Sequence, residues 1–390
     1  MSGLDTRTRP AGPTRPFEWA LATAGVGALL AAVAAAPQDA RAAAAQDWPP
    51  FVLVAGLLLV GLVADEDGLF AAGGRALARL SHNGAVLYAG TVVLVVSVTT
   101  LLNLDTSVTF LTPVLVYAAR SRGEGEAPLI YACLLLSNAG SLLLPGSNLT
   151  NLIVLGHLHL SGGAFFAHMA PAALTAAAVT ALVVAAAHHR DLRATIAPSG
   201  DGHERPVLGV GLVAVVAVTV LVVALRSPAI PVLVVGVTAV SLRSLRRETT
   251  TSAGSAVRIL GVPVLAGLFG LAVALGTLGR AWSGPATLLA HLDAWGTAFV
   301  AAVTSVLVNN LPAASLLAAR QPPHPFELLV GLNVGPNMFV TGSLAWVLWL
   351  RSARAAGGRP DVKRACLLGL ASAPLAIAAA VGVLVLGGAH

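Results

Sequence analysis

Two polar stretches of this sequence read almost alike inside otherwise apolar segments. The first, Ser137–Asn151, reads SNAGSLLLPGSNLTN, and the second, Leu332–Ala345, reads LNVGPNMFVTGSLA. At a constant spacing of 195 residues, Asn138 aligns with Asn333, Gly140 with Gly335 and Leu149 with Leu344. Amides, hydroxyls, Gly and Pro are costly inside a bilayer unless the freed backbone lines a cavity. The repetition therefore predicts two equivalent broken membrane helices.

Each of these stretches follows a second polar interruption of apolar sequence. Asn103–Ser107 (NLDTS) precedes the first, and Asn309–Pro312 (NNLP) precedes the second. A matched pair of interrupted hydrophobic segments in the two halves of a chain is a strong sequence-level indication of a transporter binding site. The pattern predicts a secondary transporter.

Composition restricts the remaining classes of protein. Of the 390 residues, 56% are hydrophobic and 10% are charged, whereas soluble domains carry about 25% charged residues. We therefore expect a polytopic protein of the lipid bilayer. No Lys/Arg run is interleaved with aromatic residues, so the net charge of +6 does not indicate nucleic acid. The sequence lacks a phosphate-binding loop and the HExxH and GxSxG motifs, so we expect no enzyme activity and no cofactor.

The basic residues predict how the chain crosses the membrane. With two re-entrant hairpins at 84–119 and 286–319, 19 of the 23 Lys and Arg residues lie on one side and 4 on the other. Positive charge marks the cytoplasmic side, so we expect a multi-pass plasma-membrane protein with a cytoplasmic N-terminus, nine crossings and an external C-terminus. The predicted crossings are 17–36, 48–64, 127–159, 169–187, 206–225, 228–242, 259–279, 326–350 and 365–387.

The predicted fold is an all-α inverted repeat, because the two hairpins open in opposite directions. Each repeat holds one hairpin followed by one broken helix, at 127–159 or 326–350. The expected divisions are a cytoplasmic N-terminal tail at 1–16, a first repeat at 17–187, a linker with one span at 188–227 and a second repeat at 228–387.

Four motifs, in this order, resemble the arsenite/antimonite permeases of the ion transporter superfamily, which also contains the sodium/dicarboxylate symporters. They are Leu101–Pro113 (LLNLDTSVTFLTP), Ser137–Leu152 (SNAGSLLLPGSNLTNL), Val308–Pro312 (VNNLP) and Gly331–Leu350 (GLNVGPNMFVTGSLAWVLWL). The sequence departs from the arsenical pattern at Met338-Phe339-Val340, where those permeases carry a small hydroxyl-rich stretch. This departure leaves the identity of the substrate open.

The resemblance implies a scaffold part and a transport part, whose hairpins and broken helices meet in the middle of the membrane. It also implies a homodimer with an elevator-like movement of the transport part. Arsenical permeases export trivalent arsenic or antimony hydroxide, either by proton exchange or together with a separate ATPase subunit.

The polar residues at the interruptions are the predicted substrate-binding residues, because half-helix ends offer free N–H and C=O groups there. We expect Asp105, the carboxylate set deep between apolar runs, to carry the coupling proton. Cys133 and Cys366 are too few for a three-thiol site, so we expect packing roles for both and no metal. The predicted substrate-binding residues are Asn103, Thr106, Ser107, Asn138, Gly140, Ser147, Asn148, Thr150, Asn151, Asn309, Asn310, Asn333, Gly335, Asn337, Thr341, Gly342 and Ser343.

Several functions fit this sequence. The leading prediction is an arsenite/antimonite efflux permease coupled to protons, since neither broken motif contains Lys or Arg and a neutral trihydroxide needs no such charge. Helix dipoles alone can hold a carboxylate, so a sodium- or proton-coupled transporter of a dicarboxylate or other small anion is the alternative. A sodium/proton exchanger on the same scaffold belongs to this alternative, and a channel and an intramembrane enzyme are weaker alternatives.

Overall fold

The computed structural model describes residues 14–388 except 82, 122, 124, 157, 159, 194–208, 226 and 246–252. Most of the predicted N-terminal tail and part of the predicted linker therefore lie outside the described residues. The described part is helical throughout and contains no β-strand. Six of its helices are long and apolar enough to cross a membrane: α1 (Thr14–Ala35), α2 (Pro37–Glu66), α4 (Gly84–Leu101), α8 (Gly162–Ala187), α12 (Val262–Ala281) and α18 (Val362–Leu386).

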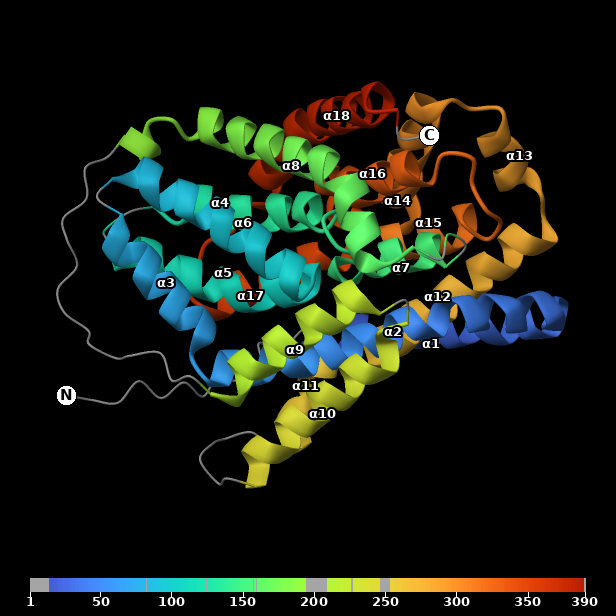
Figure 1. The fold of residues 1–390 in the computed structure, drawn as a ribbon, viewed down its shortest axis with the longest axis horizontal. Helices are drawn as coiled ribbons and strands as arrows, with labels where there is room; N and C mark the ends of the chain where they lie inside the picture. Colours follow the sequence, from blue (N-terminus) through green and yellow to red (C-terminus); the bar gives the residue numbers. More distant parts are fainter. Residues whose placement is uncertain are drawn as a thin grey trace.

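One group of helices occupies the lower part of the view in Figure 1. Within it α1 packs against α12, and α2 packs against α9, α10 and α12. Glycines allow the close approach: a Cβ on Gly25 of α1 would lie 2.0 Å from the carbonyl oxygen of Gly267 on α12. Small residues are the usual contact points between membrane helices. The shorter helices here are α9 (Val210–Ala224), α10 (Ala229–Leu245) and α11 (Ala253–Leu260).

Helix α2 differs from the predicted span at 48–64. It begins at Pro37 and continues through Pro49 and Pro50. Gln46 and Asp47 read as polar loop residues in sequence, but both sit inside this helix, and Asp47 is only 1% exposed. The helix can extend over them because their polar atoms have hydrogen-bond partners in other helices.

The second group holds the two hairpins and the two broken helices that the sequence predicts. In the first half of the chain α4 and α5 (Leu104–Arg120) form a hairpin, and the broken helix is α6 (Ala127–Gly140), the 3₁₀ turn η1 (Pro145–Ser147) and α7 (Leu149–Leu155). Helix α8 follows. The amphipathic α3 (Leu69–Leu80) lies before this hairpin.

The second half repeats this order of elements. After the short α13 (Gly284–Ala290), α14 (Ala294–Val308) and α15 (Asn310–Leu317) form a hairpin. The second broken helix comprises α16 (Pro325–Val334), the 3₁₀ turns η3 (Gly335–Met338) and η4 (Val340–Gly342), and α17 (Leu344–Ala355), and α18 follows it. In Figure 1 the α4–α5 hairpin lies in the left half of the view and the α14–α15 hairpin in the right half. The order of elements and the opposed hairpins agree with the predicted inverted-repeat transporter fold.

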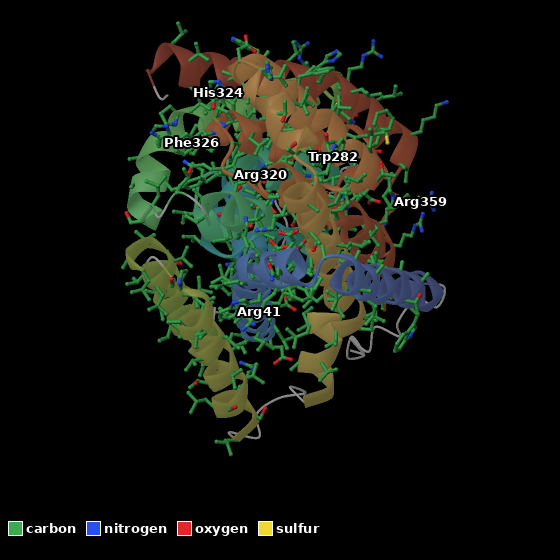
Figure 2. The ribbon with its side chains drawn as sticks, turned by 90° about the vertical axis from the view of Figure 1, so that its right-hand side faces the viewer. Arg41, Trp282, Arg320, His324, Phe326 and Arg359 are labelled. Carbon is green, nitrogen blue, oxygen red and sulfur yellow. The ribbon has the colours of Figure 1, made fainter. Side chains whose placement is uncertain are left out.

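The ends of the helices separate the charged residues in space. Figure 2 views the right-hand end of Figure 1 and labels Arg41, Arg320 and His324 there. Arg41 and Arg320 are two of the four basic residues that the charge count assigns to the external side. Helix α6, by contrast, is buried from Pro128 to Gly140 and carries no charged residue over that stretch.

Candidate functional site

The polar interruptions form the starts of helices, and an Asn or Ser residue precedes each start. The Asn103 side chain accepts a hydrogen bond from the Thr106 N–H at 2.6 Å and so caps α5. Asn148 caps α7 through the Thr150 N–H, and Asn309 caps α15 through the Leu311 N–H. Asn and Ser are preferred at this position because their side chains accept bonds from N–H groups that lack helical partners. The sequence therefore breaks each membrane segment and restarts it at these residues.

These four helix starts converge on one small cavity with a volume of about 30 Å³, which is room for about two water molecules. The wall of the cavity consists of the first residues of α5, α7, α15 and α17 together with two leucines of α12. The lining residues are Leu104, Asp105, Asn148, Leu149, Leu265, Leu268, Asn309, Asn310, Leu311, Ser343 and Leu344.

The cavity is electrostatically suited to negative charge. Helices α5, α15 and α17 contain 17, 8 and 12 residues, so each directs the positive end of a helix dipole at the cavity. Ser343 is 2% exposed, and its hydroxyl has no partner among the described residues. An unpaired buried hydroxyl is costly unless it meets a ligand or water. Asp105 is the one carboxylate in the lining, and no Lys or Arg is present there.

Asn309 at the second hairpin adopts an unusual backbone conformation. Its φ angle is 76°, and it is the one non-glycine residue with positive φ in the described part of the chain. Asn tolerates this region better than most residues, and such strain collects at functional sites. Its side-chain amide donates to the Thr341 carbonyl at 3.3 Å and so links the hairpin turn to the second break.

A second polar layer joins the two broken helices directly, and we call it the amide crossing. It comprises Asn138, Ser141, Thr150, Asn151, Asn333 and Asn337. The Asn138 amide donates to Asn337 Oδ1 at 2.8 Å, and the Asn337 amide donates to the Leu135 carbonyl at 3.0 Å. The two helices therefore exchange hydrogen bonds across their contact.

Asn333 is the centre of the amide crossing. Its Oδ1 accepts from Ser141 at 3.0 Å, from Thr150 at 3.1 Å and from the Asn148 amide. Its own amide donates to Asn151 Oδ1 and to the Leu329 carbonyl, both at 2.9 Å. Asn333 is fully buried, and its hydrogen-bonding groups are used within the protein. Asn148 joins the two layers, since it also lines the cavity.

The structure thus sorts the predicted binding residues. Asp105, Asn148, Asn309, Asn310 and Ser343 reach the cavity. Asn138, Thr150, Asn151, Asn333 and Asn337 lie in the amide crossing, and Asn148 bonds to it as well. Among the hydroxyls, Ser147 donates to the Thr100 carbonyl, Thr341 to the Val306 carbonyl, and Ser107 accepts from Ser137. Asn103 Nδ2 and Thr106 Oγ1 are buried beside the cavity with no partner among the described residues.

The three predicted glycines differ in the space around them. A Cβ on Gly335 would lie 2.6 Å from Ala302 Cα, and one on Gly342 would lie 2.5 Å from Pro336 Cα. Both positions therefore require glycine for close packing rather than for contact with a solute. A Cβ on Gly140 would meet its nearest atom at 3.5 Å, an ordinary contact.

Sequence reasoning did not find Ser141 or the leucines of the cavity. A signal for the leucines is present, because the cap residue is followed by Leu at three of the helix starts, Asn103-Leu104, Asn148-Leu149 and Ser343-Leu344, and at the fourth the cap Asn309 is followed by Asn310-Leu311. Cys133 is fully buried and lies 3.5 Å from Thr112 Oγ1, which agrees with a packing role. No cluster of His, Cys, Asp and Glu suited to a metal ion occurs among the described residues.

Comparisons with known proteins bear on this site. A family model described as citrate transporter matches residues 17–348 of the sequence. Among solved structures, the fold is similar to that in "Crystal structure of the Alcanivorax borkumensis YdaH transporter reveals an unusual topology", with a TM-score of 0.55 and 16% sequence identity over 90% of this chain and 88% of that chain. At that identity the likeness concerns the fold alone. No curated protein matches the sequence.

Proposed function

The chain belongs to the citrate transporter family, and from this premise we propose that it is a secondary active transporter of a small carboxylate anion. The proposed binding site is the cavity between the starts of α5, α7, α15 and α17. The observation that carries the proposal is the convergence of these helix starts around the unpartnered Ser343 hydroxyl. A carboxylate oxygen accepts hydrogen bonds from hydroxyls, amides and helix N–H groups, and all three surround the cavity.

Asp105 explains how such an anion is coupled to an ion gradient. Its carboxylate lines the same cavity, and two negative charges in one buried site repel each other. A proton or sodium ion on Asp105 removes this repulsion, so ion and anion bind together more readily than either binds alone. For an anionic solute this coupling favours transport of both in the same direction, whereas the sequence prediction of an antiporter assumed a neutral solute.

The surrounding fold supports alternating access. In this conformation the cavity holds about 30 Å³, which is smaller than a di- or tricarboxylate, so the helix starts separate when solute enters or leaves. The amide crossing keeps the two broken helices together during this movement. We assign the two halves of the chain, 17–187 and 228–387, to inverted repeats with the N-terminus cytoplasmic and the C-terminus external.

A second candidate is the arsenite/antimonite permease predicted from the sequence motifs. Two observations favour it: the cavity lining contains no Lys or Arg, and its volume of about 30 Å³ suits a small trihydroxide better than citrate. Hydroxyl and amide groups suffice to bind such a neutral solute. The family match and the three helix dipoles favour the carboxylate.

Transport by the purified protein in proteoliposomes tests both candidates. Uptake of labelled citrate, succinate and arsenite is compared under a proton gradient and, separately, a sodium gradient. We expect gradient-driven carboxylate uptake that Ser343→Ala weakens and that Thr219→Val, a hydroxyl deletion on α9 away from the cavity, leaves intact. Arsenite transport without carboxylate transport would favour the second candidate, and no transport of any of the three would refute both.

A further inference from the structure

A polar cluster outside the cavity connects the two groups of helices. Gln46 and Asp47 lie in the long helix α2, Arg280 lies near the end of α12, and Ser315 lies on α15. Asp47 and Ser315 are 1% and 2% exposed. Ionisable residues within membrane segments are expensive and are usually functional. We call Gln46, Asp47, Arg280 and Ser315 the carboxyl-end latch.

Gln46 binds the carboxyl ends of two half-helices at once. Its amide nitrogen donates to the Ile153 carbonyl in the last turn of α7 at 3.0 Å and to the Ala318 carbonyl that follows α15 at 3.2 Å. Carbonyls at the end of a helix lack their usual helical partner, and the Ile153 carbonyl accepts from the Gly156 N–H at 3.3 Å in addition to Gln46. The opposite ends of these same two helices, at Asn148 and Asn310, line the cavity.

The other members of the latch fix Gln46 and α15. The Arg280 guanidinium donates to Gln46 Oε1 and, at 3.0 Å, to the Gly276 carbonyl of its own helix. Ser315 Oγ donates to Asp47 Oδ2 at 3.2 Å. Arg320, in the connection after α15, donates to the Arg280 carbonyl at 2.8 Å. Helices α2 and α12 therefore hold α7 and α15 at their carboxyl ends by side-chain hydrogen bonds.

We propose that the carboxyl-end latch positions α7 and α15 in the closed conformation and that it separates when the cavity opens towards the end of the molecule marked by Arg41 and Arg320. The proposal rests on the proposed transport function and names residues that hold the site without touching the solute. Both half-helices are short, 7 and 8 residues, so a displacement of either carboxyl end also moves the amino end at the cavity. Water reaching the freed carbonyls compensates for the broken hydrogen bonds.

A reversible cross-link tests whether the latch separates. Asp47→Cys and Ser315→Cys are combined with Cys133→Ala and Cys366→Ser, and Hg²⁺, which bridges two thiolates and is removed by dithiothreitol, joins the new pair. We expect the cross-link to lower the transport rate about tenfold or more, and we expect the reductant to restore the rate. The matched control retains Cys133 and adds Thr112→Cys, because these two side chains touch within the second group of helices at 3.5 Å; its cross-link should leave transport unchanged. Full transport by the cross-linked 47/315 pair would overturn the proposal.

A labelling experiment gives an answer even if the double variant is inactive or the cargo is misidentified. Ser343→Cys, in a background without the native cysteines, reports access of a water-soluble thiol reagent to the cavity. Gln46→Leu removes the bonds to both carbonyl ends and the bond from Arg280, and we expect it to raise the labelling rate about tenfold, as the loss of these hydrogen bonds predicts. Trp19→Phe on the exposed face of α1 is the control. An unchanged labelling rate would overturn the latch and leave the proposed transport function standing.

Discussion

In the amide crossing, Asn333 accepts three side-chain hydrogen bonds and donates two, all within the protein. A few residues away, around the cavity, Ser343 is equally buried and makes none. Both layers come from the same repeated motifs and use the same residue types. We therefore take the unpaired Ser343 hydroxyl, rather than the bonded Asn333 amide, as the group that is able to bind solute.

We expect the amide crossing and the cavity to have different roles in transport. A polar group that is already bonded within the protein offers nothing to a solute, but it fixes the position of the helices that carry it. An unpaired group at a helix start gains a hydrogen bond when a solute arrives. Asn138 is a partial exception in the crossing, because its Oδ1 has no partner among the described residues. Substitutions in the crossing should therefore reduce stability, and substitutions at the cavity should reduce transport.

The largest effect on stability is expected for Asn333→Leu. This change removes the acceptor of Ser141, Asn148 and Thr150 and the donor to Asn151 and to the Leu329 carbonyl. The Thr150 hydroxyl stays buried, whereas Ser141 keeps the Asn138 carbonyl and Asn148 keeps the Ser141 hydroxyl as acceptors. We expect a loss of about 3 kcal/mol in the free energy of unfolding. Thermal unfolding of the purified protein in detergent measures it, with Thr219→Val as the control. A variant that unfolds like the wild type but no longer transports would place Asn333 in the binding site and break the distinction between the layers.

Asp105→Asn should uncouple transport from the proton gradient. The amide keeps the size of the side chain but carries no exchangeable negative charge, so we expect gradient-driven accumulation to fall about a hundredfold, or about 2.7 kcal/mol, while exchange of solute across the membrane continues. Counterflow in proteoliposomes separates the two activities. Accumulation that still follows an imposed proton gradient would remove Asp105 from the coupling step. A sodium gradient that drives wild-type uptake where a proton gradient does not would identify sodium as the coupling ion.

The sequence is informative about helices and less so about contacts between them. The repeated motifs and the apolar runs predict the hairpins, the broken helices and their order, because breaks in a membrane segment follow from local chemistry at Asn103, Asn148, Asn309 and Ser343. The helix starts at the cavity are predictable for the same reason. Periodicity and composition do not show which amides pair, since Asn138 and Asn337 are 199 residues apart in sequence.

Two further features escaped the sequence analysis for related reasons. Asp47 reads as part of a polar loop before an apolar run, because Pro49 and Pro50 suggest a helix start rather than a helix interior. Its burial depends on Ser315, which is 268 residues away. Similarly, three acids in a row after an apolar run are expected to face water, but Arg243 pairs with Glu66 at 3.1 Å and also contacts Asp67. Long-range pairing of this kind has no local signature.

Ser343→Ala tests the difference between the cavity and the amide crossing at a residue of the cavity. The Ser343 hydroxyl has no partner in the described protein, so its removal should change the free energy of unfolding by no more than about 0.5 kcal/mol. The half-saturating concentration of the carboxylate should rise about tenfold, equivalent to about 1.4 kcal/mol. Uptake kinetics and thermal unfolding are measured on the same preparation. Ser141→Ala is the matched control, because its hydroxyl bonds to Asn333 and to the Asn138 carbonyl; it should lose stability. Equal behaviour of the two variants would contradict the division into layers.

The smallest effect is expected for Trp346→Phe, next to the second break but outside the cavity lining. Its fully buried indole N–H donates to the Pro336 carbonyl at 2.9 Å, and this carbonyl is available because Pro336 lies where α16 ends. Phe removes the donor and part of the ring volume, so we expect a loss of about 1 kcal/mol in stability. Trp19→Phe, whose ring is 61% exposed, should lose almost nothing. Transport by Trp346→Phe should stay near the wild-type rate, because Trp346 lies outside the cavity lining and its indole bonds to the Pro336 carbonyl rather than to a group at the cavity. A fall in transport without a fall in stability would show that the second break itself moves during the cycle. The boundary between the amide crossing and the residues of the cavity would then lie closer to Pro336 than the hydrogen bonds indicate.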